Sequence, residues 1–106
     1  MAQIPKSLTI TLVVGDEEVT FQFRPPTNPE LNHFLESRFD IGRHGKVKGR
    51  ALQARIDFFD LLLIGVDNLN DGDDPITPAH VDRIPMNWKN DVIFRCFEDN
   101  EVDVKN

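Results

Sequence analysis

The sequence predicts an α+β fold in which an N-terminal antiparallel β-hairpin packs against three or four helices. Two runs of alternating apolar and polar residues within residues 8–24 predict the hairpin. A later run from Arg50 to Ile64 has apolar residues at spacings of three and four and contains no Pro or Gly, which predicts the longest helix. The 106 residues are 40% apolar and 28% charged, an ordinary globular composition, and this length predicts a single domain over residues 1–106.

The predicted hairpin has one apolar face and one polar face. The apolar face carries Leu8, Ile10, Leu12, Val14, Val19, Phe21 and Phe23. A short connection from Gly15 to Glu18 joins the strands, and Pro25-Pro26 ends the second strand because proline cannot donate a hydrogen bond to a strand ladder. A hairpin alone is marginally stable in water, so its apolar face is expected to pack on the long helix.

Helices are expected at about residues 28–39, 50–64, 78–84 and 87–98. Thr27 and Glu30 have the spacing of a capping box, with Pro29 in the first turn, so the first helix is expected to begin here. Thr77 followed by Pro78 repeats this signal ahead of the third helix.

The helix over residues 50–64 is expected to form the centre of the core. Its residues fall on two adjoining stripes: Leu52, Ile56, Phe59 and Leu63 on one, and Ala51, Arg55, Phe58 and Leu62 on the other. Such a wide apolar arc suits a helix that is buried on two sides. We expect the first stripe to contact the hairpin, and the Phe58–Leu62 stripe to be covered either by the last helix or by a partner. Gly65 is expected to end the helix in the left-handed conformation.

Three stretches are expected to lie outside regular structure. Residues 40–49 contain three glycines and no apolar periodicity, which predicts a flexible loop. Residues 66–75 are dense in Asp, Asn and Gly, which predicts a solvated turn. The acidic tail, residues 99–106, is expected to be disordered.

Charge is distributed unevenly along the chain. Residues 38–55 carry six basic groups and one acidic group, whereas residues 56–106 carry four basic and twelve acidic groups. The net charge of the whole chain is −6, which argues against general affinity for nucleic acids. The basic segment 38–55 is the feature of the composition that indicates binding.

The sequence favours a cytoplasmic location. The single cysteine, Cys96, excludes an intramolecular disulfide and indicates a reducing compartment. The first residues, MAQIPKSL, lack the apolar core of a signal peptide. No apolar run reaches the roughly 18 residues that span a membrane, so no membrane association is expected.

The motifs that suggest chemistry lack required residues at the required spacing. The glycine-rich segment before the long helix differs from a nucleotide-binding P-loop, because Asp40 and Val47 occupy the positions that require Gly and a hydroxyl residue. The acidic stretch after Asp67 places Leu69 and Pro78 where a calcium loop needs oxygen ligands. The three histidines have no zinc-ligand spacing. No metal, no cofactor and no enzymatic activity are therefore expected.

The predicted hairpin ends in FQFRPPT, Phe21 to Thr27, and a mostly helical body follows. The segment from Ile84 to Asp91 leads into the last predicted helix. Both stretches resemble the bacteriophage and prophage tail assembly chaperones, in which an N-terminal hairpin ends in a similar run before a mostly helical body and the C-terminal region is similar to the second segment. The resemblance implies a small, acidic, non-enzymatic protein that binds the tape-measure protein before the tail tube polymerises around it.

The leading interpretation is a non-enzymatic protein-binding protein, acting singly or as a homo-oligomer on the tape-measure protein or another tail protein. The side chains expected to contact this partner are apolar or cationic: Phe58, Leu62, Trp88, Arg43, Lys46 and Lys48. The alternative is a small nucleic-acid-associated regulator that uses the basic segment 38–55.

Overall fold

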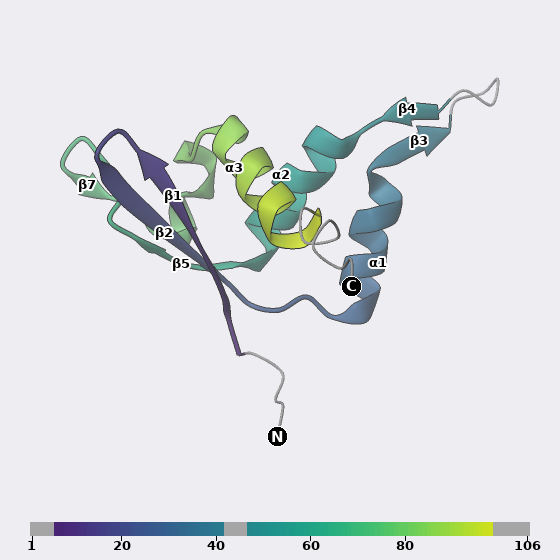
Figure 1. Cartoon of the computed structure of the whole chain (residues 1–106), viewed down its shortest axis with the longest axis horizontal. Helices are drawn as coiled ribbons and strands as arrows, with labels where there is room; N and C mark the ends of the chain where they lie inside the picture. The colour runs from purple at the N-terminus through teal and green to yellow at the C-terminus, as the bar shows by residue number, and fades with distance from the viewer. Residues whose placement is uncertain (1–5, 42–46, 99–106) are drawn as a thin grey trace, which may run out of the picture.

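Figure 1 shows the computed structural model, which describes residues 6–41 and 47–98. The elements in chain order are strands β1 (Leu8–Val14) and β2 (Glu17–Phe23), helix α1 (Asn28–Ser37), strands β3 (Phe39–Ile41) and β4 (Val47–Gly49), helix α2 (Ala51–Leu62), strands β5 (Leu63–Asp67), β6 (Asn70–Asp71) and β7 (Asp74–Pro75), the 3₁₀ helix η1 (Pro78–Arg83), helix α3 (Met86–Ile93) and the π-helical turn η2 (Phe94–Glu98). An antiparallel sheet followed by helices confirms the predicted α+β fold. The tail predicted to be disordered, residues 99–106, lies outside the described residues.

Strands β1 and β2 form the predicted hairpin. Their antiparallel register ends at Val14 opposite Glu17, which leaves the two-residue turn Gly15-Asp16. Gly15 has a φ of +63°, a left-handed conformation that glycine adopts without strain. Along β2, buried apolar residues alternate with more exposed polar ones, as the pattern predicted.

The sheet has a third strand that the sequence analysis missed. The helix predicted over residues 50–64 ends at Leu62, and Leu63 begins β5, which pairs antiparallel with β2. A run of Leu and Ile suits both a helix end and a buried strand, so periodicity alone could not separate the two. The prediction that Gly65 ends the helix is wrong: Gly65 lies opposite Gln22 in the ladder, where a Cβ would come within 2.7 Å of Gln22 Oε1.

The segment predicted as a flexible loop, residues 40–49, contains most of a two-stranded ribbon. Strand β3 follows α1, strand β4 precedes α2, and the two pair antiparallel with Asp40 opposite Lys48. The first helix therefore ends at Ser37 rather than at residue 39. Residues 42–46, between the two strands, lie outside the described residues. The ribbon extends away from the body of the molecule (Figure 1).

The later elements differ in geometry from the predicted helices. The segment predicted over residues 78–84 is the 3₁₀ helix η1, which begins after Thr77 as the capping signal indicated. The helix predicted over residues 87–98 consists of α3 followed by the π-helical turn η2. Residues 66–75, predicted as a solvated turn, contain the end of β5 and the small hairpin β6–β7.

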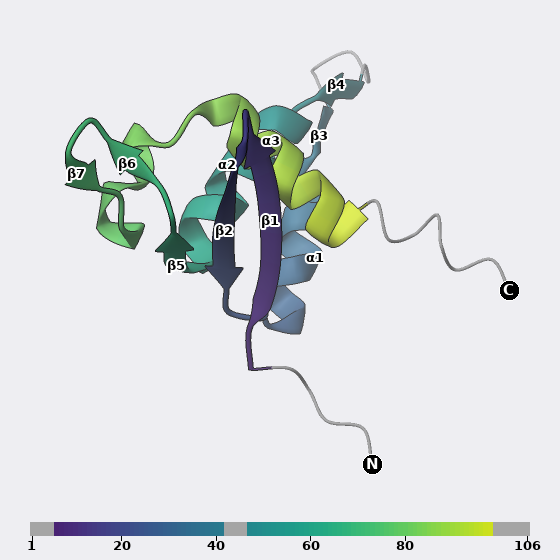
Figure 2. The ribbon, with the colours of Figure 1, turned by 60° about the vertical axis from the view of Figure 1, so that its left-hand side comes forward.

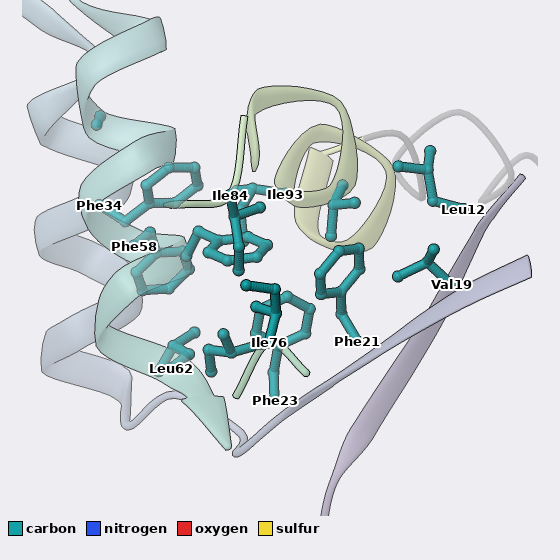
Figure 3. Packing of buried hydrophobic residues seen from close by; sticks show 14 residues of the cluster. Leu12, Val19, Phe21, Phe23, Phe34, Phe58, Leu62, Ile76, Ile84 and Ile93 are labelled. Carbon is teal, nitrogen blue, oxygen red and sulfur yellow. The ribbon is translucent and has the colours of Figure 1, made fainter. Parts of the chain in front are cut away.

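The core forms where the sheet packs on α2 and α3 (Figure 3). Phe59 of α2 is fully buried, and its ring packs edge-to-face against Phe21 and Phe23, with centroid distances of 5.4 and 5.2 Å. The expected contact between this stripe of the helix and the hairpin is confirmed.

The other stripe of α2 is covered from the opposite side. Phe58 stacks on Phe34 of α1, with ring centroids 4.3 Å apart, and meets the ring of Phe97 edge-on at 5.0 Å. Phe58 is 4% exposed and Leu62 is 0% exposed. Of the two alternatives for this stripe, cover by the chain itself is correct, and α1 shares that cover with the end of the last helical segment.

Replacing Phe59 by Ala is expected to lower the free energy of unfolding by about 4 kcal/mol, because it leaves a cavity between the sheet and α2. The matched control is Leu61→Ala in the same helix, which is expected to cost about 0.5 kcal/mol or less because Leu61 is 51% exposed. Urea denaturation followed by circular dichroism measures both. Equal losses in the two variants would contradict the assignment of the core.

Candidate functional site

A groove runs along the seam between α1 and α2. It consists of two adjoining hollows of about 300 and 260 Å³, which share Ser37, Ala54 and Asp57 in their walls. The larger hollow extends to Leu61, and the smaller one extends to Phe39 at the start of the ribbon. The groove therefore follows much of the length of both helices.

Both helices present the same residue spacing to the larger hollow. Helix α1 contributes Pro29 and the set Glu30, His33, Phe34 and Ser37, and α2 contributes the set Ala54, Asp57, Phe58 and Leu61. Each set follows the spacing i, i+3, i+4, i+7, which defines one face of a helix. Phe34 and Phe58 are buried and form the floor, whereas the polar residues and the half-exposed Leu61 form the rims.

The rims of the groove carry carboxylates. Glu30 accepts hydrogen bonds from Arg24 at 2.8 and 2.7 Å and from the backbone N–H of Thr27 at 2.9 Å, which completes the predicted capping box. The bonds from Arg24, and then the bond from Thr27, lower the pKa of Glu30 to about 2. On the α2 rim, Asp57 is exposed and accepts a hydrogen bond from Gln53 at 2.8 Å. The groove thus combines an apolar floor with polar rims, in which Glu30 is paired with Arg24, Asp57 is exposed, and Arg50 lines the smaller hollow.

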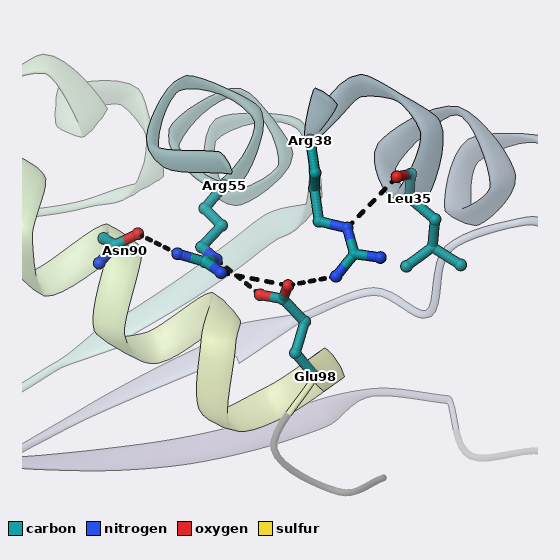
Figure 4. A network of polar contacts seen from close by, with 5 residues as sticks. All are labelled: Leu35, Arg38, Arg55, Asn90 and Glu98. Atoms are coloured by element: carbon teal, nitrogen blue, oxygen red, sulfur yellow. Dashed lines mark hydrogen bonds and ion pairs between the residues drawn. The ribbon is translucent and has the colours of Figure 1, made fainter. Parts of the chain in front are cut away.

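A buried carboxylate in η2 joins this turn to the two helices that form the groove (Figure 4). Glu98, 5% exposed, accepts hydrogen bonds from Arg38 and Arg55, each at 2.6 Å. Arg55 also donates to Asn90 Oδ1 at 2.9 Å. Burial raises the pKa of Glu98, but the bonds from Arg55 and Arg38 outweigh it and hold the pKa below its ordinary value.

This network was not predicted from the sequence. Glu98 is 43 residues from Arg55 and 60 from Arg38, and no local pattern reports contacts over such separations. The π-helical turn η2, which was predicted as ordinary helix, carries Glu98 to this position. The sequence contained one signal of this network: a single Glu at the end of an apolar helical face, together with two Arg in other predicted helices.

The network also occupies part of the positive charge of the basic segment 38–55. Two of its six cations, Arg38 and Arg55, are directed to Glu98 rather than to a ligand. Lys48 lies in β4, whereas Arg43 and Lys46 lie outside the described residues. The charge that this segment offers to a nucleic acid is therefore smaller than its composition indicates.

The predicted apolar contact residues do not form one surface. Phe58 and Leu62 are core residues, 4% and 0% exposed, so neither projects from the surface; Phe58 still lines the floor of the larger hollow, whereas Leu62 lines neither hollow. Their apolar stripe is used internally, against α1 and η2. Trp88 is half-buried against the core from α3. The sequence analysis missed Leu61, which lies one turn after Phe58 and stands exposed at the rim.

The carboxylates and the thiol that could carry chemistry lie in separate surroundings. Among residues 6–41 and 47–98, no group of three or more His, Cys, Asp or Glu side chains is placed to hold a metal ion. Asp60 lies one turn from Asp57 but accepts a hydrogen bond from Lys89 at 2.8 Å, so the two carboxylates have separate partners. Burial raises the pKa of the Cys96 thiol, which disfavours the nucleophilic thiolate.

This chain matches no protein-family model, no curated protein and no solved structure. Within the described part of the chain, no helix combines the length and the apolar character that crossing a lipid bilayer demands. The functional interpretation therefore rests on the residues and the geometry of the chain itself.

Glu98→Gln is expected to lower the free energy of unfolding at pH 7 by about 3 kcal/mol, because Arg38 and Arg55 lose their shared anion in a largely buried site. The folded-state pKa of Glu98 lies below its ordinary value of 4.5. The stabilisation by the carboxylate is therefore present above pH 4.5 and is lost as the pH falls through the lowered folded-state pKa. The wild-type protein should lose stability on acidification more steeply than the variant.

Urea denaturation at a series of pH values measures this difference. The control is Asp91→Asn, which breaks the exposed ion pair with Arg95 and is expected to cost about 0.5 kcal/mol or less. Parallel pH profiles for the wild-type protein and Glu98→Gln would contradict the role of the network.

Proposed function

We propose that this chain is a non-enzymatic protein-binding protein that holds a helical segment of its partner in the groove between α1 and α2. The observation that supports this proposal is the groove itself, with Phe34 and Phe58 in its floor and the exposed Leu61 on its rim. Grooves of this kind receive the apolar face of an amphipathic helix, whose side chains recur at i, i+3, i+4 and i+7.

The length of the groove suits a short helical segment. Helix α1 has 10 residues and α2 has 12, so their axes are about 15 and 18 Å long. A partner helix of about three turns would lie along this length and direct two or three apolar side chains to the aromatic floor.

Asp57, which is exposed on the α2 rim, favours a partner helix with a basic residue beside its apolar face. Glu30 on the α1 rim is ionised at neutral pH because its pKa is about 2, but Arg24 already neutralises its charge. The net charge of −6 would also attract a basic partner over a longer range. Lys or Arg residues flanking an apolar stripe are therefore the expected signature of the partner.

Within this class, the proposed role is that of a phage or prophage tail assembly chaperone, and the sequence resemblance supports it. The run FQFRPPT, which carries the resemblance, forms the end of β2 and the connection to α1. It supplies Arg24, whose ion pair with Glu30 stands at the end of the groove. The partner would be the tape-measure protein, bound in the host cytoplasm before the tail tube polymerises around it, and no cofactor is required.

Co-expression with a tape-measure protein whose gene neighbours that of this chain, followed by affinity capture, tests the proposal. Leu61→Glu places a charge at the rim of the apolar floor and is expected to weaken capture about tenfold or more. The matched control is Leu52→Glu, on the same helix and 48% exposed against 51% for Leu61, but outside both hollows. This control should bind as the wild-type protein does.

Equal binding by the two variants would show that the groove is not the binding site. A tape-measure protein that is equally soluble without this chain would contradict the chaperone role. Salt-dependent retention on heparin, lost on replacing Lys48, would instead favour the alternative in which the basic segment 38–55 binds nucleic acid.

A further inference from the structure

The outer edge of β1 is an unprotected strand edge. The strand order is β1-β2-β5, and among the described residues no strand pairs with the outer side of β1 (Figure 2). Proteins protect such edges with proline, charged residues or bulges. The seven residues of β1, LTITLVV, contain no proline, glycine or charge, and the irregularity in the sheet lies on its other side, between Gln22 and Phe23 in the pairing with β5.

The hydrogen bonds of β2 identify which residues of β1 face this edge. The N–H of Arg24 donates to Leu62 O at 3.0 Å, and Glu18 O accepts from the side chain of Asn68 at 2.8 Å, so even-numbered residues of β2 face β5. Odd-numbered residues of β2 consequently face β1, where the register places even-numbered residues opposite them. The backbone groups of β1 that point outward are therefore those of its odd-numbered residues: Thr9, Thr11 and Val13.

We propose that this edge is a self-association surface, through which two copies of the chain pair β1 against β1 in antiparallel orientation, with the two-fold axis at Thr11. Thr11 then lies opposite Thr11 of the second copy, and Thr9 lies opposite Val13. All the outward backbone groups pair in this register, because they belong to hydrogen-bonded positions on both strands. The two sheets become one continuous sheet, and both unprotected edges disappear.

The side chains of β1 are suited to the same register. On the inner face, Leu8, Ile10 and Val14 are partly exposed in the single chain, and only Leu12 is buried. The proposed pairing places Leu8 opposite Val14 and Ile10 opposite Leu12, so these residues gain apolar neighbours. On the outer face, Val13 is 64% exposed, and Thr9 of the second copy would lie opposite it.

Charge at the two ends of β1 favours a second copy over an unrelated strand. Lys6 precedes β1, and Asp16 follows it in the hairpin turn. The register centred on Thr11 brings Lys6 of each copy to the end of the second copy's hairpin, where the turn carries Asp16, so the same opposite charges come near each other twice. Self-complementarity of this kind is the property of an isologous two-fold interface.

The inference is independent of the proposed function. The groove is formed by residues of α1 and α2 and by the start of the ribbon, and none of its lining residues belongs to β1. A dimer formed through β1 therefore contains two grooves, which would bind two segments of one long partner with increased avidity.

Disulfide formation in a Cys96→Ala background tests the register. Thr11→Cys is expected to form an intermolecular disulfide readily, because the two Cα atoms of a hydrogen-bonded pair lie about 5.5 Å apart. Thr9→Cys is the control, since the two copies of residue 9 lie about 14 Å apart in this register. Cross-linking of Thr11→Cys that is no faster than that of Thr9→Cys would overturn the proposal.

Sedimentation equilibrium up to several hundred micromolar tests the association itself. The wild-type chain is expected to dimerise, and Lys6→Glu or Asp16→Lys alone should weaken the dimer about tenfold, whereas the double variant restores it.

Thr11→Pro should weaken the dimer about a hundredfold, because proline removes an N–H that points outward and is not used in the β1–β2 ladder. Thr11→Val keeps this N–H and serves as its control.

Circular dichroism melts report whether each variant folds, and the charge reversals remain informative where the proline variant does not. A wild-type chain that stays monomeric over the whole concentration range would overturn the proposal. So would a double charge reversal that fails to restore association. Loss of partner capture with an intact dimer would contradict the groove as the binding site and would not affect the proposed β1–β1 interface.

Discussion

The burial of Phe59 between Phe21 and Phe23 is the contact on which the rest of the structure depends. It fixes α2 on the sheet through the largest apolar side chains in the core, which are fully removed from water. The same helix continues directly into β5, which pairs with β2 beside those phenylalanines. Packing and backbone pairing therefore position α2 relative to the sheet independently, and α2 in turn supplies one wall of the groove.

The other wall of the groove depends on two contacts of a different kind. The stacked rings of Phe34 and Phe58 join α1 to α2 at the floor, and Glu98 joins Arg38 just after α1 to Arg55 on α2. These contacts hold the helices side by side without closing the seam between them, so a hollow remains above the two buried rings. The stability of the groove thus depends on a residue, Glu98, that lies outside it.

The sequence predicted local features well and long-range ones poorly. Alternation in β2 and the capping box at Thr27 were correct because each depends on residues close together in the chain. Strand β5 was missed because its pairing partner lies forty or more residues earlier, and apolar periodicity around Leu62 suits either structure. The cover of Phe58 was left open for the same reason: it comes from Phe34 and Phe97, and neither is near it in sequence.

The direct passage from α2 to β5 also fixes the length of the chain at this point. Leu62 is the last helical residue and Leu63 the first of the strand, so no loop is present there to absorb an added or deleted residue. One extra residue would either turn Phe59 out of the core or move every side chain of β5 to the other face of the sheet. Length variation among any relatives of this chain should therefore spare the junction and fall in turns such as Asp71–Asp74, where the backbone is exposed.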